Sequence, residues 1–373
     1  MNRLRKFLFH LKNVIAYNQL PAEERVLTVY SEGQNYWSYL GGLIETILST
    51  SDISICYVTS SHTDPGLDID HPRLRKFVID EGFVRDWMFA NLDTKVMVMT
   101  MPDLDQYQVK RSKHSVHYIY IQHSLVSFHM VYRPGAFDAF DTVFCSGPHH
   151  LTEMREIEKA KGLEPKNLFE HGYARLDIIK NENTTNSNTD KTSPTHYLLA
   201  PSWGENGTIE SGIGSKIVRR LLESGAKVTL RPHPQTIKFF NEKVQVIVDE
   251  HEGNENFNYE NNVRGTQSLR DSDVMICDWS GAALDYAFGL EKPVLFVDVP
   301  RKVNNPGYEN IPITPFEVRI RETIGAIVDP DDLQALETFD VKPLPKNIAD
   351  KYVFNVGSSD RVGAKEIIRI VQE

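Results

Sequence analysis

The sequence lacks any apolar stretch that approaches the roughly 20 residues needed to cross a bilayer. Cysteine is scarce, with only Cys56, Cys145 and Cys277 in 373 residues. Their count is odd, their spacing matches no metal site, and each lies in an apolar run, so we expect buried free thiols in a reducing compartment. Together these absences predict a cytoplasmic protein.

Positive charge is also in short supply. The chain has 41 Lys and Arg against 51 Asp and Glu, which gives a formal net charge of -10. A general nucleic-acid binder needs a broad basic field, so nucleic acid is excluded as a partner. The 40% hydrophobic and 25% charged content is that of a globular protein, and the length exceeds one ordinary core, which predicts two domains.

Residues 1–22 have an amphipathic pattern. Basic and apolar side chains recur at helical spacing, and the apolar runs are too short and too interrupted for a signal peptide. The helix either packs on the first domain, or residues 1–16 make a peripheral contact with an anionic membrane surface. The basic residues are Arg3, Arg5, Lys6 and Lys12, and the apolar ones are Leu4, Phe7, Leu8, Leu11 and Ile15.

Strand-like apolar runs alternate with helical patterns along the rest of the chain, which predicts an α/β fold with parallel sheets. Residues 181–195 are almost free of apolar side chains and rich in Asn, Thr and Ser, so we interpret them as a linker. It separates a Rossmann-like domain at 23–180 from a second at 196–373, whose last helix can pack back on the first domain. The expected strands are 26–30, 53–59, 95–100, 115–121, 142–145, 168–170, 197–200, 227–230, 245–248, 274–277, 293–297 and 325–328.

Polar side chains follow several of these strands, where two facing sheets would place a ligand. The first group is Gln122-His123-Ser124, directly after the strand at 115–121. A histidine there can act as a general base near neutral pH, or it can simply be hydrogen-bonded within a turn.

The second group is Arg231-Pro232-His233-Pro234, after the strand at 227–230. The prolines fix the backbone on both sides of His233, and the guanidinium of Arg231 suits phosphate oxygens. This turn predicts anion binding, with a rigid connector that carries a surface arginine as the alternative.

The third group runs from Asp278 to Asp285, where a strand meets small residues and then a helix. Ser280 and Gly281 would lie at the helix N-terminus, which is a natural phosphate site, although Ser280 can equally be a plain N-cap. Asp285 falls about one turn into the helix and faces either the ligand or solvent.

Two further segments lie beside this predicted cleft. Ser202 and Trp203 end the first strand of the second domain, and Arg175 and Asp177 precede the linker. Two Asp-x-Asp matches, at 68–70 and 103–105, follow no convincing strand, and such short matches arise by chance. We therefore assign no metal site.

In this order the motifs resemble the CDP-glycerol glycerophosphotransferase family, the polymerases and primases of teichoic-acid-like polymers, which have the GT-B fold. The resemblance spans roughly residues 26–330. Four positions depart from the family pattern: Ser124 and Gly204 replace a glycine and an arginine, Ala174 replaces a proline, and Gly281 replaces the second serine of the phosphate turn. The matching residues are His123, Gly172, Tyr173, Arg175, Asp177, Pro201, Ser202, Trp203, His233, Pro234, Asp278, Ser280 and Asp285.

The resemblance implies transfer of glycerol phosphate, or a related polyol phosphate, from a CDP-activated donor to a saccharide or lipid-linked acceptor, with release of CMP. His123 would be the base, His233 and Arg231 would neutralise donor charge, and Ser280 would hold a phosphate. The donor would also be bound by Gly281, Asp278, Ser202, Trp203 and Asp285. Gln122, Ser124, Arg175 and Asp177 would support the site. The scheme requires no cofactor and no metal held by the protein.

Two other functions fit the same motifs. A GT-B glycosyltransferase that uses a nucleotide sugar for capsule or lipopolysaccharide would release UDP or GDP instead of CMP. A non-catalytic nucleotide-binding subunit would fit the substitutions at Gly204 and Gly281. Retention of His123, His233, Arg231 and Asp278 counts against it. The sequence indicates no oligomeric state.

Overall fold

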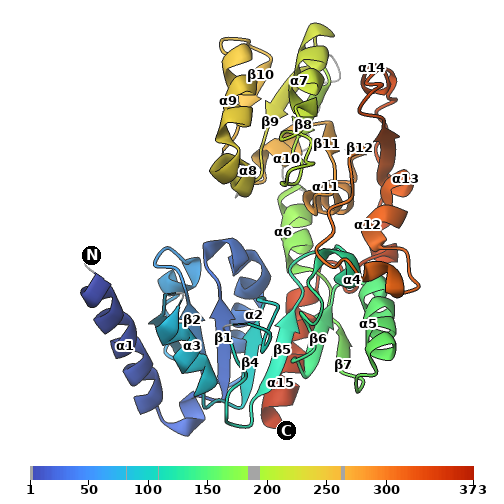
Figure 1. The fold of residues 1–373 in the computed structure, drawn as a ribbon. Helices are drawn as coiled ribbons and strands as arrows, with labels where there is room; N and C mark the ends of the chain where they lie inside the picture. The colour runs from blue at the N-terminus through green and yellow to red at the C-terminus, as the bar shows by residue number, and fades with distance from the viewer. Residues whose placement is uncertain (1–2, 81, 108, 184–193, 262–264) are drawn as a thin grey trace.

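The computed structural model describes residues 3–80, 82–107, 109–183, 194–261 and 265–373. Two parallel sheets stand one above the other in Figure 1, the first formed by the N-terminal half of the chain. Their strand orders are β3-β2-β1-β4-β5-β6-β7 and β10-β9-β8-β11-β12-β13. The strands are β1 (Leu27–Ser31), β2 (Ile55–Thr59), β3 (Leu74–Val78), β4 (Val96–Met99), β5 (His117–Ile121), β6 (Thr142–Cys145), β7 (Asn167–Glu170), β8 (His196–Leu199), β9 (Lys227–Leu230), β10 (Phe257–Tyr259), β11 (Val274–Cys277), β12 (Val294–Val297) and β13 (Gly325–Val328).

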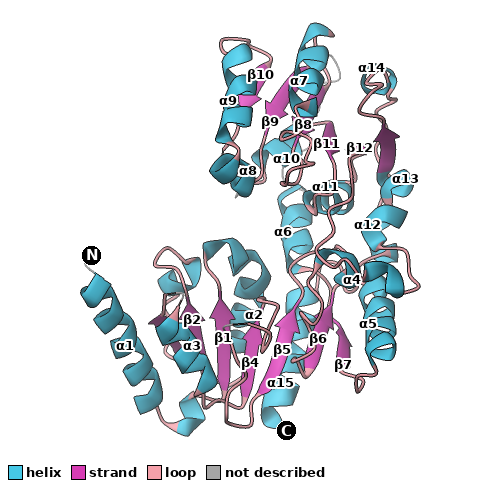
Figure 2. Cartoon of the chain, in the orientation of Figure 1, coloured by secondary structure: helices cyan, strands magenta, loops and turns pink. Residues whose placement is uncertain are grey.

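Central strands such as β1 and β4 are buried along their whole length because helices cover both faces of each sheet (Figure 2). In β4, Val96 and Val98 enter one core while Met97 and Met99 enter the core on the other face. The helices are α1 (Arg3–Gln19), α2 (Trp37–Thr50), α3 (Phe83–Ala90), α4 (Phe128–Val131), α5 (Pro148–Lys161), α6 (Ala174–Asn183), α7 (Ile213–Glu223), α8 (Pro234–Phe239), α9 (Asn241–Glu250), α10 (Gln267–Asp271), α11 (Ala282–Leu290), α12 (Phe316–Arg319), α13 (Arg321–Ile324), α14 (Ala335–Thr338) and α15 (Ser359–Gln372).

One expected strand is wrong. Residues 245–248 lie within α9, and Val244 and Ile247, three positions apart, bury the same helical face. The sequence analysis missed two strands, β3 and β10, which both lie at sheet edges. Charged Arg75 and Lys76 obscure the apolar pattern of β3, and β10 has only three residues.

The two halves are tied together by the end of the chain. Helix α15 packs against α2 beside the first sheet, so close that a side chain at Gly42 would collide with the Asp360 carboxylate. Most of the expected linker, 184–193, lies outside the described residues. The division into domains at 181–195 therefore stays a prediction.

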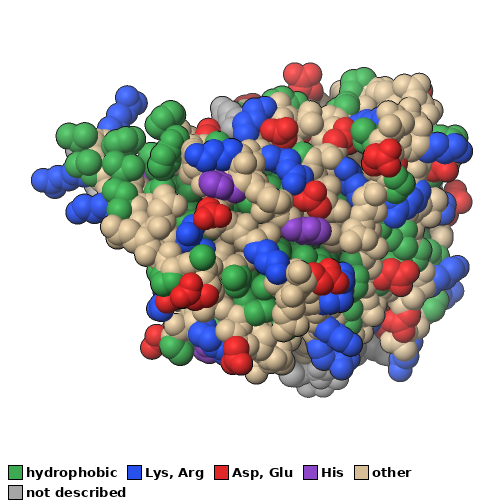
Figure 3. Space-filling model, turned by 90° about the horizontal axis from the view of Figure 1, so that it is seen from below, with side chains coloured by type: hydrophobic (Ala, Val, Ile, Leu, Met, Phe, Trp, Pro, Cys, Tyr) green, Lys and Arg blue, Asp and Glu red, His purple; other side chains and the backbone are tan. Residues whose placement is uncertain are grey.

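Helix α1 packs on α3 and β3 through one face only. His10, Val14 and Tyr17 are buried, and the Tyr17 hydroxyl lies 2.9 Å from Thr28 Oγ1. Leu4 and Leu8 are 63% and 46% exposed. Viewed from below in Figure 3, this end of the molecule presents hydrophobic side chains next to Lys and Arg. Among the described residues, no helix is long and apolar enough to cross a membrane.

The three cysteines are buried and unpaired, as the sequence predicted.

Candidate active site

A cavity of about 450 Å³ lies between the carboxyl ends of the two sheets. It is lined by loops that follow β1 and β2 below and β8, β9 and β11 above, at the strand ends where α/β sheets bind ligands. The first half contributes Gln34, Asn35, Trp37, Ser38, Tyr39, Pro65, Arg175 and Ile178, and the second contributes Ala200, Pro201, Arg231, Pro232, His233, Pro234, Leu269, Ser280, Ala282 and Asp285.

The turn before α11 forms one wall of this cavity. Ser280 lines it, and its hydroxyl accepts from the Ala282 N–H at 3.3 Å, so Ser280 both faces the cavity and satisfies an amide of the first helical turn. Asp285, only 7% exposed, pairs with Arg175 Nε at 2.7 Å. This ion pair joins α6 to α11 across the cavity, so Asp285 is already neutralised by a protein cation.

His233 is the N-cap of α8. Its Nδ1 accepts from the Gln235 N–H at 3.1 Å, so the proton of the neutral ring lies on Nε2. Burial, with a further contribution from the Lys302 ammonium, lowers the His233 pKa to about 4. At neutral pH His233 is therefore uncharged in this cavity and can donate a hydrogen bond to a ligand through Nε2–H.

Arg231 lines the cavity but is only 6% exposed. Its guanidinium donates to Ser268 Oγ and to the Gly265 carbonyl, both at 2.9 Å. Much of its donor capacity therefore holds the segment around α10, which makes Arg231 a supporting residue as well as a cavity residue.

Asp278 does not face the ligand, contrary to the sequence expectation. It is 1% exposed, and its carboxylate accepts from the N–H groups of Ser202, Thr208 and Trp279 and from the Thr208 hydroxyl. Ser202 is likewise buried, and its amide is used in this network. These groups hold the loops after β8 and β11 together, which fixes the wall that carries Ser280.

Trp203 stacks on His233, with ring centroids 6.1 Å apart. The Lys302 ammonium lies 4.7 Å from the Trp203 ring centre, and burial lowers its pKa. Lys302 follows β12 in a loop that carries no motif, so sequence reasoning missed it. Its ammonium places a positive charge beside His233, a role that we had predicted for Arg231 from the sequence.

His123 directly follows β5 and lies among four tyrosines. The rings of Tyr36, Tyr39, Tyr120 and Tyr132 meet it edge-on at 5.7–6.2 Å between centroids. Tyr39 also lines the cavity, so His123 lies immediately behind the cavity wall. Burial lowers the His123 pKa to about 4, which leaves the imidazole neutral at physiological pH.

Tyr120 orients the ring of His123. Its hydroxyl donates to Gln122 Oε1 at 2.9 Å and lies 3.0 Å from His123 Nδ1. When this hydroxyl donates to Gln122, its oxygen accepts from Nδ1–H, and that tautomer leaves the lone pair on Nε2. A hydrogen bond with the Thr100 backbone acts against burial and raises the pKa of the ring. Gln122 is 1% exposed and also accepts from the Tyr132 hydroxyl at 3.3 Å, so it orients the tyrosines and does not touch a ligand.

Asp177 lies away from the cavity. Its carboxylate accepts from the Gly357 N–H at 2.6 Å and from the amide and hydroxyl of Ser359, the first residue of α15. Asp177 thus anchors the returning C-terminal helix, and its contribution to the site is structural.

The loop after β1 was missed as part of the site. Gln34 and Asn35, followed by the start of α2, line the cavity, and buried Asp64 holds the neighbouring loop by accepting from Ser31, Tyr57 and Thr59 hydroxyls at 2.7 Å. The available signal was the polar run at 31–35 directly after a strand.

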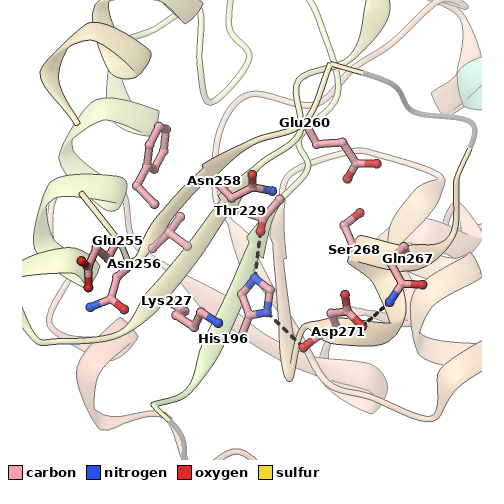
Figure 4. A pocket seen from close by; sticks show the side chains of 12 residues that line it. His196, Lys227, Thr229, Glu255, Asn256, Asn258, Glu260, Gln267, Ser268 and Asp271 are labelled. Carbon is pink, nitrogen blue, oxygen red and sulfur yellow. Dashed lines mark hydrogen bonds between the residues drawn. The ribbon is translucent and has the colours of Figure 1, made fainter. Parts of the chain in front are cut away.

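A second pocket, of about 350 Å³, lies at the opposite end of the upper sheet (Figure 4). His196 and Lys227 are the first residues of β8 and β9, so this pocket borders the amino ends of the strands. Both ring nitrogens of His196 are hydrogen-bonded, to Thr229 Oγ1 at 2.8 Å and to the Asp271 carbonyl at 3.0 Å. We interpret this pocket as a surface hollow in which the histidine already has hydrogen-bond partners within the protein.

Comparison with known proteins agrees with the motifs. Residues 137–301 match the profile of the family described as CDP-Glycerol:Poly(glycerophosphate) glycerophosphotransferase. This segment of the chain is similar to that family. The matched residues include β6, the linker and the loops that carry His233 and Ser280. No curated protein matches the sequence.

Solved structures show the same architecture. The wall teichoic acid polymerase TagF superposes with a TM-score of 0.59 at 16% identity, covering 99% of this chain and 97% of that one. The UDP-GlcNAc 2-epimerase of Methanocaldococcus jannaschii, in complex with UDP-GlcNAc and UDP, gives 0.61 at 15% identity, with 93% and 99% covered. At these identities the likeness shows the fold, which is GT-B.

Proposed function

We propose that the protein transfers glycerol phosphate, or a related polyol phosphate, from a CDP-activated donor to a hydroxyl of a membrane-linked or polymeric saccharide, with release of CMP. The observation that carries this proposal is the pairing of a neutral His123 behind one wall of the cavity with donors for a diphosphate on the other wall. The family match favours a CDP-activated donor.

In the proposed step, His123 Nε2 removes the proton from the acceptor hydroxyl. The acceptor oxygen attacks the phosphorus that bears the polyol, the bond from that phosphorus to the oxygen of CMP breaks, and CMP leaves with the electron pair. Charge on the donor diphosphate is stabilised by His233 Nε2–H, the Ser280 hydroxyl, the first turn of α11 and the nearby Lys302 ammonium. Positioning and electrostatics carry the reaction.

Nucleotide release tests the proposal. The purified protein is incubated with CDP-glycerol, CDP-ribitol and a panel of UDP-, GDP- and CMP-sugars, with membrane extract as acceptor. We expect CMP from a CDP-polyol and none from the same reaction with His123→Ala. Release of UDP or GDP instead would assign the protein to the sugar transferases, and no release from any donor would favour a non-catalytic subunit.

We also propose that α1 places the enzyme on an anionic membrane surface, near a lipid-linked acceptor. Exposed Leu4, Leu8 and Ile15 share the helix with Arg3, Arg5, Lys6 and Lys12, and exposed Phe83 and Trp87 of neighbouring α3 extend the apolar surface. Apolar side chains beside basic ones suit the boundary between acyl chains and anionic headgroups.

Deleting residues 1–16 would be a poor test, because it removes the buried His10 and Val14. The double variant Leu4→Ser/Leu8→Ser changes only exposed side chains. We expect it to reduce sedimentation with phosphatidylglycerol vesicles, while Val246→Ser, an equally exposed position on α9, leaves sedimentation unchanged. If both variants sedimented as wild type does, the membrane contact would be wrong and α1 would serve only to pack on the first domain.

A further inference from the structure

Ser124 and Gly281 touch across the cleft. Ser124 lies in the loop after β5 of the first sheet, and Gly281 lies in the turn after β11 of the second. A Cβ on Gly281 would lie 3.1 Å from Ser124 Oγ and 3.6 Å from Val126 Cγ1. The first distance is tighter than nine in ten real Cβ contacts, so any side chain at 281 would require Ser124 to move.

The backbone does not explain this glycine. Gly281 has φ −61° and ψ −22°, an ordinary helical conformation that every L-residue adopts easily. Gly204, by contrast, has φ +140°, where a side chain is strained. The requirement at 281 therefore comes from the neighbouring hydroxyl.

The Ser124 hydroxyl accepts one hydrogen bond and can still donate another. Its oxygen accepts from the Val126 N–H at 3.4 Å, which leaves its own proton to donate. On the other side of the contact, the Ser280 hydroxyl accepts from the Ala282 N–H. One hydroxyl from each half thus lies at the first turn of α11, and that of Ser280 faces the cavity.

The same two positions depart from the family pattern, and they depart in opposite directions. Where the pattern has a glycine after the histidine, this chain has Ser124, and where it has a second serine in the phosphate turn, this chain has Gly281. Compared with that pattern, the turn after β11 has one hydroxyl fewer, and the neighbouring loop after β5 has one hydroxyl more.

We propose that Ser124 and Gly281 act as one unit: Ser124 supplies, from the His123 loop, a hydroxyl that binds the diphosphate of a nucleotide-activated donor, and Gly281 leaves the space this hydroxyl needs. The assignment of the ligand rests on the proposed function, whereas the fit of the two residues does not.

The test is a cycle of Ser124→Gly, Gly281→Ser and the double variant Ser124→Gly/Gly281→Ser. Binding of inorganic pyrophosphate is measured by calorimetry, and KM and kcat are measured with CDP-glycerol. Each single change should weaken pyrophosphate binding and raise KM by roughly tenfold, since a hydrogen bond to a charged group is lost or displaced. The double variant should recover to within about threefold of wild type.

Thermal unfolding without ligand separates the two parts of the inference. Gly281→Ser alone should lower Tm, and Ser124→Gly should restore it in the double variant. Additive losses in the double variant, in Tm and in pyrophosphate binding, would overturn the pairing. Pyrophosphate that fails to bind wild type would overturn the ligand assignment, whereas binding without CMP release from CDP-glycerol would contradict only the proposed donor.

Discussion

The two halves of the protein each place a histidine shortly after a strand, and the two rings have different neighbours. The Tyr120 hydroxyl lies against Nδ1 of His123, whereas Nδ1 of His233 accepts a backbone amide at the start of α8. Burial lowers the pKa of each ring to about 4. In the proposed reaction the same side chain serves as a proton acceptor in one half and as a hydrogen-bond donor in the other.

This contrast shows what determines each role. His123 is surrounded by tyrosines, and burial keeps its ring neutral, which favours a neutral base. His233 lies against Trp203 and near the Lys302 ammonium, a location suited to an anionic ligand. The surroundings of each ring, and not the residue type, separate the acceptor side of the cleft from the donor side.

The largest expected effect is that of His123→Ala. Loss of a general base should reduce kcat by on the order of 10²–10⁴ and leave Tm close to wild type. CMP release is the measurement, and His114→Ala, at an exposed position on the same half, is the control. Near-normal turnover by His123→Ala would exclude this histidine as the base.

His233→Asn should come next. Asparagine keeps an acceptor for the Gln235 N–H at the N-cap, so the helix stays capped while the Nε2–H donor is lost. We expect on the order of 10²–10³ less transfer with little change in Tm. His233→Ala, which also removes the cap, should lose about 1 kcal/mol of stability in addition. If His233→Asn kept full activity, the donor role of Nε2 would be wrong.

Protonation of the buried histidines should destabilise the protein in mild acid. Burial lowers the pKa of fully buried His150 and His171 to about 4, below the 6.5 of the unfolded chain. The unfolded state binds more protons between these values, so stability should fall as pH decreases from 6.5 to 4, by up to roughly 3 kcal/mol for each ring. Glu317, whose pKa burial raises to about 6, opposes this trend below pH 6.

Tm measured from pH 8 to 4.5 checks this expectation. His123→Ala and His233→Ala should each make the decline shallower, because each removes one ring with a lowered pKa. A flat profile in wild type would contradict neutral buried rings and would weaken the comparison between the two sites.

The smallest expected effect is that of Tyr120→Phe, which removes the hydroxyl on His123 Nδ1. The ring keeps its place among the tyrosines but loses the partner that selects its tautomer, so kcat should fall about fivefold to tenfold. Tyr118→Phe, on the same strand but bonded to the Ser112 amide outside the cleft, is the matched control. Equal kcat values for the two variants would mean that Tyr120 does not orient the base.

The sequence by itself determined the alternation of strands and helices, because residues buried on both faces of a parallel sheet must be apolar. It also determined which loops reach the cleft, since polar groups that follow parallel strands meet at one edge. His123, His233 and Ser280 were found in this way. Edge strand β3 and the helix at 245–248 were misjudged because short segments carry too little periodicity.

Only the tertiary structure decided what each polar group in those loops does. Asp278 and Asp177 have motif positions like that of Asp285, yet their carboxylates are fully occupied by amides and hydroxyls from distant segments. Lys302 lies beside Trp203, and Ser124 lies beside Gly281. The two residues of each pair are more than 90 positions apart in the sequence. A hydrogen-bond partner is chosen by position in space, and no local pattern of the chain records it.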